Sequence, residues 1–349
     1  MDLAFSSPGT RVARARGSID QFESAGDAVI IRGWILHPDL TFNSAAVTLD
    51  GGPAAGCELT QRPDVAAAFP HLSHALLSGF AVRLPYPTAT GPTVAITVEG
   101  KYAGNSRASF SWHAPGRSRV NGHAVPAEHL RVRVAGNPDA ESFLQVGCQA
   151  AMMMMRAVEQ HAPGGRPWSL LDWGCGSGRV TAAIVELHPD LKLSGCDLDA
   201  EAITWCNQHI RAGAFHVTGP YPPLPFADQS FDAVLACSVM THLPWSVQKK
   251  WLAEIRRVLR PGGVFVATVH GRFAAAFLPG ELARLDRKGI IERHRDAALD
   301  GIAPRNYYRG VFQTPAFTQR HWTRGYELVD YVEGGLAAFQ DLVVLRRSG

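Results

Sequence analysis

The sequence contains no long apolar run and no paired cysteine motif, and both absences narrow what it can encode. No apolar stretch approaches the roughly 20 residues that a helix needs to cross a bilayer, so we expect no membrane span. The N-terminus has no apolar signal-peptide core. The six cysteines show no C-x-x-C spacing, which argues against a metal site of the zinc type and fits a reducing cytoplasm.

The chain also lacks a strong excess of either charge. Its 34 basic and 31 acidic residues leave a formal net charge of +3, and the arginines are scattered, so we expect no nucleic-acid partner. Apolar residues make up 46% of the 349 positions. This length and this balance suit a globular protein of two ordinary domains.

The first third of the chain is expected to be an all-β domain. Strand-like runs with turn signals between them cover residues 28–36, 45–49, 79–84, 93–98 and 107–112. This density of strands predicts a small β-sandwich over residues 18–113, after a disordered tail over residues 1–17. Between the strands, one short helix is expected over residues 62–77, with Asp64 as its N-cap.

Five short patterns in this domain resemble a small β-sandwich module that is joined to bacterial glycosyltransferases and methyltransferases. They are Gly-Ser-Ile-Asp at residues 17–20, Gly-Trp at 33–34, Asp-Gly at 50–51, Arg-Pro-Asp-Val at 62–65 and Gly-Phe at 79–80. By analogy alone, the resemblance implies a saccharide or glycoconjugate as a partner of the protein.

A segment rich in proline, glycine, arginine and histidine follows, and it predicts a linker over residues 114–138. The next segment, 139–161, has apolar residues at helical spacing. Its four methionines, at 152–155, cover every side of that helix. They are expected either to fill gaps in the core or to form a soft lid over a substrate pocket.

Strand and helix patterns then alternate to the end of the chain. Repeated βα units predict an α/β domain over residues 139–349, built on a doubly wound, Rossmann-like parallel sheet. Strand-like runs at 327–332 and 341–346 are too close in sequence for another crossover. They predict an antiparallel C-terminal hairpin at one edge of the sheet.

The first strand of this domain runs into a loop with glycine at every second position. Residues 172–178 read Asp-Trp-Gly-Cys-Gly-Ser-Gly, and a helix begins near Arg179. Glycine allows a sharp turn and a close approach to a ligand, and the N–H groups of a helix start favour an anionic group. A dinucleotide fold prefers G-x-G-x-x-G. The spacing here disfavours a dehydrogenase, which would bind NAD.

This loop resembles the first motif of class I methyltransferases that use S-adenosylmethionine (SAM). Asp197 ends the second strand, 25 residues after Asp172, and residues 224–232 contain Leu-Pro-Phe and Phe-Asp at the spacing of that family. The resemblance covers residues 140–349 and implies a seven-stranded sheet with SAM as cofactor. It places these residues at the cofactor: Asp172, Trp173, Gly174, Cys175, Gly176, Gly178, Asp197, Leu198, Tyr221 and Ser238.

The resemblance assigns these residues different parts of SAM. Asp172 orients the methionine end, Asp197 accepts the ribose hydroxyl groups, and Leu198 packs on the adenine. Ser238 lies beside the methionine part. Pro220 stands where many members have aspartate for the adenine amino group, so another contact is needed there. Tyr221 is a wall of the pocket or a plain packing residue.

Two histidines follow strands that end at the same edge. His242 lies in a Ser-Val-Met-Thr-His-Leu turn that resembles one in the family, and His270 ends the fifth strand. Each is a candidate catalytic base, although His242 also suits a role as a brace for its loop. A charged insertion at 284–308 ends near Tyr307, Tyr308 and Arg309, which either contact the substrate or pack on the surface.

The sequence therefore predicts a SAM-dependent methyltransferase that acts on a small-molecule or saccharide acceptor. A non-catalytic, methyltransferase-like scaffold is the alternative, supported by the missing aspartate at Pro220. The nature of the acceptor is not encoded in these motifs.

Overall fold

The computed structural model describes residues 13–37, 41–70, 72–86, 93–102, 107–116, 124–165, 168–211, 213–278, 280–337 and 339–349. Contacts along the chain divide it into two compact units, Met1–Gly116 and Arg117–Gly349. That separate domains cover residues 18–113 and 139–349 stays a prediction. No helix in the described ranges is long and apolar enough to cross a membrane.

The N-terminal unit consists mainly of β-strands, as predicted. Its five-stranded sheet has the order β1-β9-β8-β4-β5, its four-stranded sheet the order β2-β3-β7-β6, and only β1 and β9 pair in parallel among these described strands. The two sheets meet where Gly17 of β2 lies against the ring of Phe110 of β9. The strands are β1 (Ala13–Arg14), β2 (Arg16–Ala25), β3 (Ala28–Leu36), β4 (Phe42–Leu49), β5 (Ala55–Gly56), β6 (Glu58–Thr60), β7 (Gly79–Pro85), β8 (Thr93–Tyr102) and β9 (Arg107–Pro115).

Two predictions for this unit are wrong in part. The expected disordered tail over 1–17 includes β1 and the start of β2; its first twelve residues lie outside the described ranges. The expected helix over 62–77 is α1 (Pro63–Ala68) followed by a separate 3₁₀ turn, η1 (Ala75–Leu77). Asp64 is not the N-cap. It lies in the first turn of α1, where it binds the guanidinium group of Arg62 through both oxygens.

The C-terminal unit is built on a seven-stranded sheet, which confirms the predicted fold. The strand order is β12-β11-β10-β13-β14-β18-β17, with β12 to β14 parallel and β18 antiparallel to both neighbours, so the terminal hairpin lies at one edge. The strands are β10 (Ser169–Trp173), β11 (Lys192–Asp197), β12 (Gly213–Val217), β13 (Phe231–Ala236), β14 (Leu259–Val269), β17 (Tyr326–Leu336) and β18 (Gln340–Arg347).

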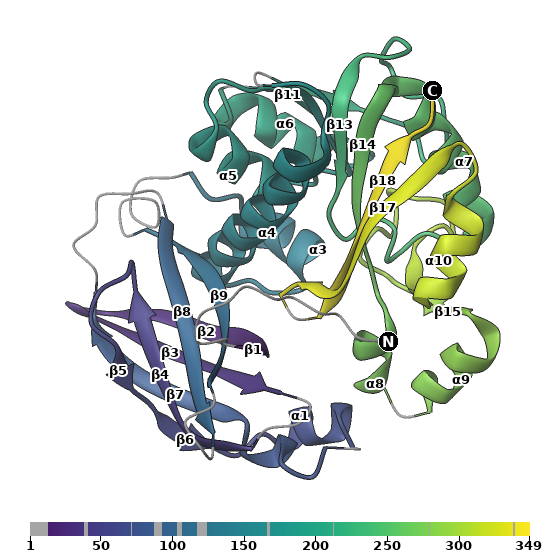
Figure 1. Ribbon diagram of the computed structural model, residues 1–349. Coiled ribbons are helices and arrows are strands. Elements are labelled where there is room, and N and C mark those ends of the chain that lie inside the picture. Colours follow the sequence, from purple (N-terminus) through teal and green to yellow (C-terminus); the bar gives the residue numbers. More distant parts are fainter. Residues whose placement is uncertain are drawn as a thin grey trace. The chain divides into compact units, whose positions relative to one another are not determined.

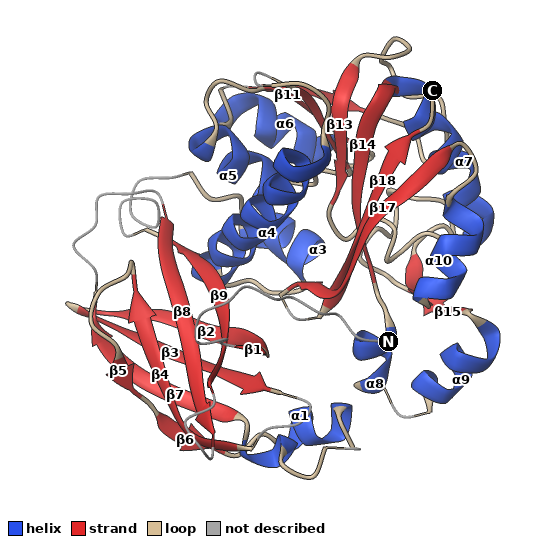
Figure 2. Ribbon diagram, viewed as in Figure 1, coloured by secondary structure: helices blue, strands red, loops and turns tan. Residues whose placement is uncertain are grey.

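Helices cover both faces of this sheet (Figures 1 and 2). On one face lie α4 (Ala140–His161), α5 (Arg179–Leu187) and α6 (Ala200–His209); on the other lie α7 (Trp245–Val258) and α10 (Pro315–Trp322). Alternate strand residues serve the two faces, so Leu170 packs under α4 and α5 while Leu171 packs under α7. Met154 and Met155 are fully buried in the core cluster under α4 and α5. This burial supports gap-filling packing for those two methionines.

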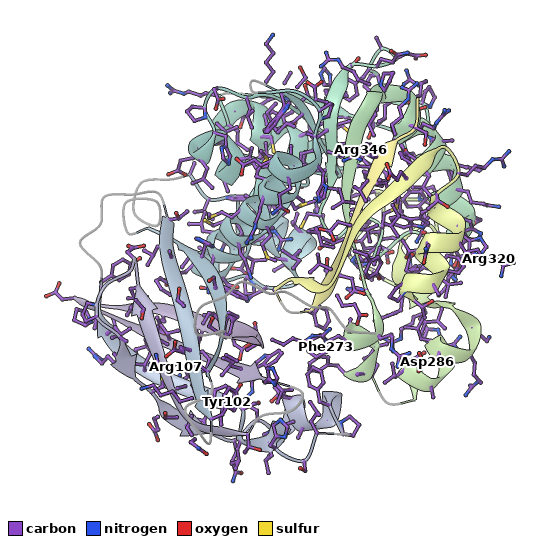
Figure 3. The ribbon with its side chains drawn as sticks, in the orientation of Figure 1. Tyr102, Arg107, Phe273, Asp286, Arg320 and Arg346 are labelled. Atoms are coloured by element: carbon purple, nitrogen blue, oxygen red, sulfur yellow. The ribbon has the colours of Figure 1, made fainter. Side chains whose placement is uncertain are left out.

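The predicted linker over 114–138 is wrong where it contains a helix. Residues 114–115 still belong to β9, and α3 spans Glu128–Ala135 before Gly136, whose φ of 65° ends the helix. The predicted insertion is also ordered. Around it lie α8 (Arg272–Ala276), α9 (Glu281–Lys288), β15 (Ile290–Arg295) and β16 (Arg309–Gln313). An ion pair between Arg272 and Asp286 joins α8 to α9. Figure 3 labels Phe273 of α8 and Asp286 of α9.

Candidate active site

Three parallel strands bring their carboxyl ends together where the strand order reverses. β10 lies between β11 and β13, and the chain passes from β10 to β11 on one side, whereas β13 and β14 lie on the other. Open α/β sheets bind ligands at such a switch point. Asp172 and Trp173 end β10, Asp197 ends β11, and Ser238 follows β13. The candidate residues from three motifs therefore meet at one edge.

The loop after β10 requires glycine at each of three positions. Gly174, Gly176 and Gly178 have φ angles of 74°, 53° and 77°, in the left-handed region that side chains disfavour. A Cβ atom on Gly176 would lie 2.7 Å from Cγ2 of Val134. The loop leads directly into α5, whose N-cap Gly178 offers no side-chain cap. The start of α5 can therefore present N–H groups to an anion.

Asp172 is buried at the end of β10, behind this loop. Its Oδ2 atom accepts a hydrogen bond from Oγ1 of Thr181 on α5. Burial raises the pKa of Asp172 to about 6; the hydrogen bond from Thr181 opposes the rise, the charge of Asp197 adds to it, and that of Arg179 opposes it. This carboxyl group therefore changes its charge close to neutral pH.

Asp197 holds the loop and the following turn with its two oxygens. Oδ2 accepts the N–H of Gly176 at 2.8 Å, and Oδ1 accepts the N–H of Asp199 at 2.9 Å. Burial raises the pKa of Asp197, and these backbone bonds act against the rise. A carboxylate oxygen has capacity for a second hydrogen bond, so Asp197 can still receive ligand hydroxyl groups. Asp199 is the N-cap of α6, where its side chain accepts the N–H groups of Glu201 and Ala202.

Trp173 and Cys175, two of the residues predicted at the cofactor, have side chains that lie in the protein core. Trp173 is 4% exposed and packs on Trp251, with ring centroids 4.8 Å apart. Cys175 is buried in a cluster with Cys206 behind the loop. Only the backbone of Trp173 and Cys175 therefore contributes to the loop surface. Leu198 is partly buried against the cluster around Trp173, so it keeps some surface for a ligand.

Ser238 has a backbone conformation that is uncommon for a residue with a side chain. Its φ is 60°. Its N–H donates to Oγ1 of Thr268 at 2.7 Å, and the side-chain amide of Gln340 donates to its hydroxyl oxygen at 3.0 Å. Bonds to β14 and β18 therefore fix Ser238 beside the end of β13, in a position of the kind that often accompanies function.

Two tyrosines from the segment before β16 lie near Asp197. Tyr307 makes an edge-to-face contact with Tyr221, with centroids 5.5 Å apart. Burial raises the pKa of Tyr307, and the charge of Asp197 adds to the rise. Burial also raises the pKa of Tyr308. The charge of Asp197 raises this pKa further, and the charge of Arg179 opposes the rise. The structure thus brings Tyr221, Tyr307 and Tyr308 close to the Asp197 end of the site.

His242 and His270 lie together, with ring centroids 6.1 Å apart. His242 stacks on Tyr308 at 4.1 Å, and His270 stacks on Phe312 at 4.8 Å. Burial lowers the pKa of His242 to about 4, although Asp296 opposes this, and it lowers the pKa of His270 to about 3. Both imidazoles are neutral at pH 7, so each can accept a proton.

Two parts of the site were not identified from the sequence. Arg179 follows the last glycine of the loop, and its buried Nε atom has no hydrogen-bond partner among the described residues. Its charge acts on Asp172 and on Tyr308. The helix α3 lies over the loop, because Val134 packs at Gly176 and Arg133 pairs with Asp199. Arg179 could have been identified from the sequence, because it directly follows the glycine motif.

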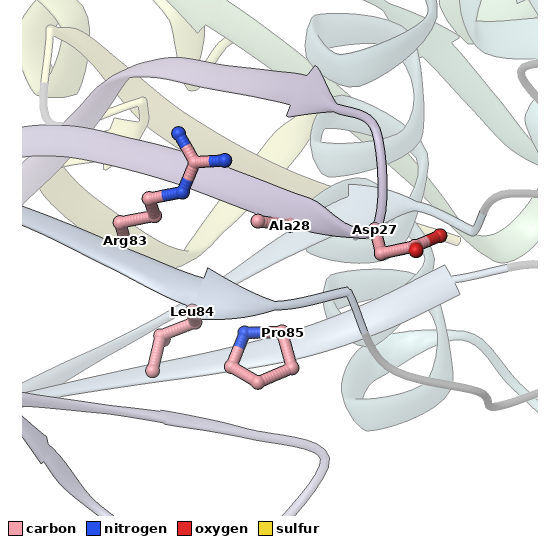
Figure 4. Close-up of a pocket in the computed structure, with 5 residues that line it drawn as sticks. All are labelled: Asp27, Ala28, Arg83, Leu84 and Pro85. Atoms are coloured by element: carbon pink, nitrogen blue, oxygen red, sulfur yellow. The ribbon is translucent and has the colours of Figure 1, made fainter.

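The N-terminal unit has a hollow of its own. It is lined by Asp27, Ala28, Arg83, Leu84 and Pro85, from β3, β7 and the turn before β3 (Figure 4). One carboxylate, one guanidinium group and aliphatic carbon do not form a catalytic cluster, so we assign no chemistry to it.

Comparison with known proteins identifies the family. A family model described as a methyltransferase domain matches residues 171–267. A fatty-acid O-methyltransferase of Mycolicibacterium smegmatis is 37% identical over 100 residues, which are 28% of this chain and 36% of that protein. The phthiotriol/phenolphthiotriol dimycocerosates methyltransferase of Mycobacterium tuberculosis is 30% identical over 197 residues, 53% of this chain and 71% of that protein.

A third relative, the malonyl-[acyl-carrier protein] O-methyltransferase of Herminiimonas arsenicoxydans, is 32% identical over 127 residues, 36% of this chain and 44% of that protein. The chain thus spans less than half the length of two of these relatives and 71% of the other. On the match to the mycobacterial relative and to the domain model, this chain belongs to the class I SAM-dependent methyltransferases. The cofactor of this family is SAM.

Proposed function

We propose that this chain transfers the methyl group of SAM to an oxygen atom of an apolar small molecule. The observation that carries the proposal is the meeting of Asp172, the glycine loop and Asp197 at one switch point of the sheet. Bound SAM supplies a methyl group already activated by its sulfonium. The task of the protein is therefore to position the two partners and to exclude water.

The residues at this edge fit the parts of SAM. The carboxyl group of Asp172 suits the ammonium group, and the guanidinium group of Arg179, with its unpartnered Nε, suits the carboxylate. Asp197 suits the ribose hydroxyl groups. Ser238 would lie beside the methionine part, and Leu198 and Tyr221 would flank the adenine. Since Pro220 has no polar side-chain atom, backbone groups would bind the adenine amino group.

The proposed acceptor follows from the relatives. Two of the three are named as O-methyltransferases, and the names describe a fatty acid, a phthiotriol lipid and a malonyl group on a carrier protein. These names favour an apolar acceptor with an oxygen nucleophile. They give no support to the saccharide acceptor suggested by the β-sandwich resemblance. The near-neutral pKa of Asp172 and the intact loop favour an enzyme over a scaffold.

Two measurements on the full chain test this function. Calorimetric titration with SAM is expected to show one binding site. With methyl-tritiated SAM, we expect the label to be transferred to dodecanoic acid, dodecanol or 4-nonylphenol. We expect no transfer to a maltooligosaccharide. A folded sample that binds no SAM at millimolar concentration would contradict the proposal.

The affinity for SAM is expected to fall as the pH falls through 6. Asp172 has a pKa of about 6 without ligand, and only its charged form attracts the ammonium group. If the neutral form binds poorly, Kd rises about tenfold between pH 7.5 and pH 5. His242 and His270 are neutral across this window, since their pKa values are about 4 and about 3.

Calorimetry across the pH range checks this, with Asp172→Asn as the matched variant. An asparagine oxygen can still accept the hydrogen bond of Thr181, so the variant is expected to fold and to bind weakly at every pH. The same tenfold pH dependence in the variant would show that another group, such as Asp197, is responsible.

A further inference from the structure

The loop that carries His242 is held by the segment between β14 and β17. The N–H of Arg309 donates to the carbonyl of His242 at 3.0 Å, and that of Val311 donates to the carbonyl of Thr241 at 2.8 Å. The ring of Tyr308 is stacked on the imidazole, with 10° between the two planes. This segment therefore fixes both the backbone and the ring of His242.

One carboxylate of the same segment faces the imidazole. Oδ2 of Asp296 lies 3.8 Å from Nδ1 of His242. The other oxygen, Oδ1, accepts the N–H of Ala298 at 2.9 Å, and the N–H of Asp296 donates to the carbonyl of Tyr308 at 3.0 Å. Nδ1 of His242 is buried and has no hydrogen-bond partner among the described residues. A held carboxylate oxygen thus stands beside an unpartnered ring nitrogen.

Other titratable groups around His242 are engaged elsewhere. His270, which directly follows β14, lies edge-on to His242 and stacks on Phe312. Tyr308 offers the face of its ring. Glu292 of β15 accepts the N–H of Trp245 at 2.9 Å and pairs with Arg309 at 3.6 Å. Asp296 is the charge that acts against the effect of burial on the pKa of His242.

We infer that Asp296 is a positioning residue that keeps a proton on Nδ1 of His242, so that Nε2 takes the proton of an alcohol or phenol acceptor. The inference rests on the proposed methyl transfer and narrows its acceptor class to a hydroxyl group. A carboxylate acceptor has no proton at neutral pH and needs no base.

The step balances without another reactant. The acceptor oxygen forms a bond to the methyl carbon, the carbon–sulfur bond breaks with its electron pair going to sulfur, and the hydroxyl proton goes to Nε2. The products are the methyl ether and S-adenosylhomocysteine, and the imidazolium returns its proton to solvent. The 3.8 Å separation from Asp296 exceeds a hydrogen bond. We expect it to shorten as the imidazole becomes positively charged.

Nitrogen-15 NMR of the histidines in the full chain tests the tautomer without any acceptor. His242→Gln identifies the signal. In the wild type we expect a protonated Nδ1 and an unprotonated Nε2. In Asp296→Asn, we expect a shift toward the other tautomer and a lower pKa for His242. A wild-type ring protonated on Nε2, or a signal that Asp296→Asn leaves unchanged, overturns the inference.

Kinetics with 4-nonylphenol and dodecanol give the second readout. His242→Gln is expected to lower kcat about 100-fold or more, and Asp296→Asn about tenfold, with the KM of the acceptor and the Kd of SAM within twofold of wild type. In Asp296→Asn the acid limb of the kcat profile moves to lower pH, because the pKa of His242 falls. Asp296→Glu is expected to restore part of kcat.

Asp300→Asn is the matched control. Asp300 lies in the same segment and pairs with Arg295 rather than with His242, so its loss is expected to leave kcat unchanged. If dodecanoic acid were the sole acceptor methylated, and at the same rate by wild type and Asp296→Asn, the inference would be overturned. The proposed function would still stand. Absence of SAM binding in the wild type overturns both.

Discussion

Replacing Asp197 by alanine is expected to weaken SAM binding about 100-fold or more and to abolish methyl transfer. The carboxylate is proposed to accept two ribose hydroxyl groups, and a hydrogen bond to a charged group contributes about 1.5–3 kcal/mol. Two such bonds correspond to at least about 100-fold in Kd. The same substitution removes the bonds to the N–H groups of Gly176 and Asp199. The glycine loop would therefore lose its support as well as its ligand contact.

Calorimetric titration with SAM, together with a thermal melt of each variant, checks this expectation. Asp197→Asn retains one acceptor oxygen, so it is expected to fall between alanine and wild type. Asp190→Asn removes a carboxylate that is exposed on the surface, and it is expected to bind SAM as wild type does. If Asp197→Ala remained folded and bound SAM within a few fold of wild type, the assignment of Asp197 to the ribose would be wrong.

The strand-to-helix alternation and the loop motif allowed the C-terminal fold to be predicted from sequence. Both depend on local signals, namely hydrophobic period, glycine spacing and strand ends that must share an edge. The same alternation indicates where the side chain of Trp173 points. Leu171 and Trp173 lie two residues apart on β10 and so share a face. In the structure both side chains lie in the core cluster under α7.

The surroundings of His242 could not be predicted, because their contacts join residues far apart in sequence. Asp296 lies near His242 in the structure. It belongs to the charged insertion at 284–308, whose sequence gives no sign of this contact. In the predicted linker, α3 is stabilised by Arg133 reaching Asp199, and only Gly136 marked the end of a helix. Neither contact produces a periodic pattern of residues from which it could be predicted. Long-range polar pairs of this kind are specified by the tertiary fold rather than by propensity.

Replacing Gln248 by leucine is expected to lower the free energy of unfolding of the C-terminal unit by about 3–5 kcal/mol. Gln248 is fully buried on α7. Its Nε2 donates to the carbonyl oxygens of Leu243 at 2.9 Å and Met240 at 3.2 Å, and its Oε1 accepts Nε1 of Trp322 at 3.1 Å. Leucine would leave these buried groups unpaired, and each unpaired group costs about 1–3 kcal/mol.

This glutamine also explains how the candidate base is held in place. Met240 and Leu243 flank His242, and the third contact of Nε2 is Oε1 of Gln313 on β16, at 3.2 Å. One side chain therefore ties α7 to the His242 loop, to β16 and to α10. Loss of these bonds is expected to loosen the His242 loop and lower kcat, while the SAM side, formed by β10 and β11, keeps its affinity.

Hydrogen exchange read by mass spectrometry separates these effects, because peptides from α7, the His242 loop and β16 report on the C-terminal unit alone. Gln319→Leu, at an exposed position of α10, is the control and is expected to change stability by less than about 0.5 kcal/mol. If Gln248→Leu lost no more protection than this control, the bonds of Gln248 would contribute little. The His242 loop would then have to be fixed mainly by its backbone bonds to Arg309 and Val311.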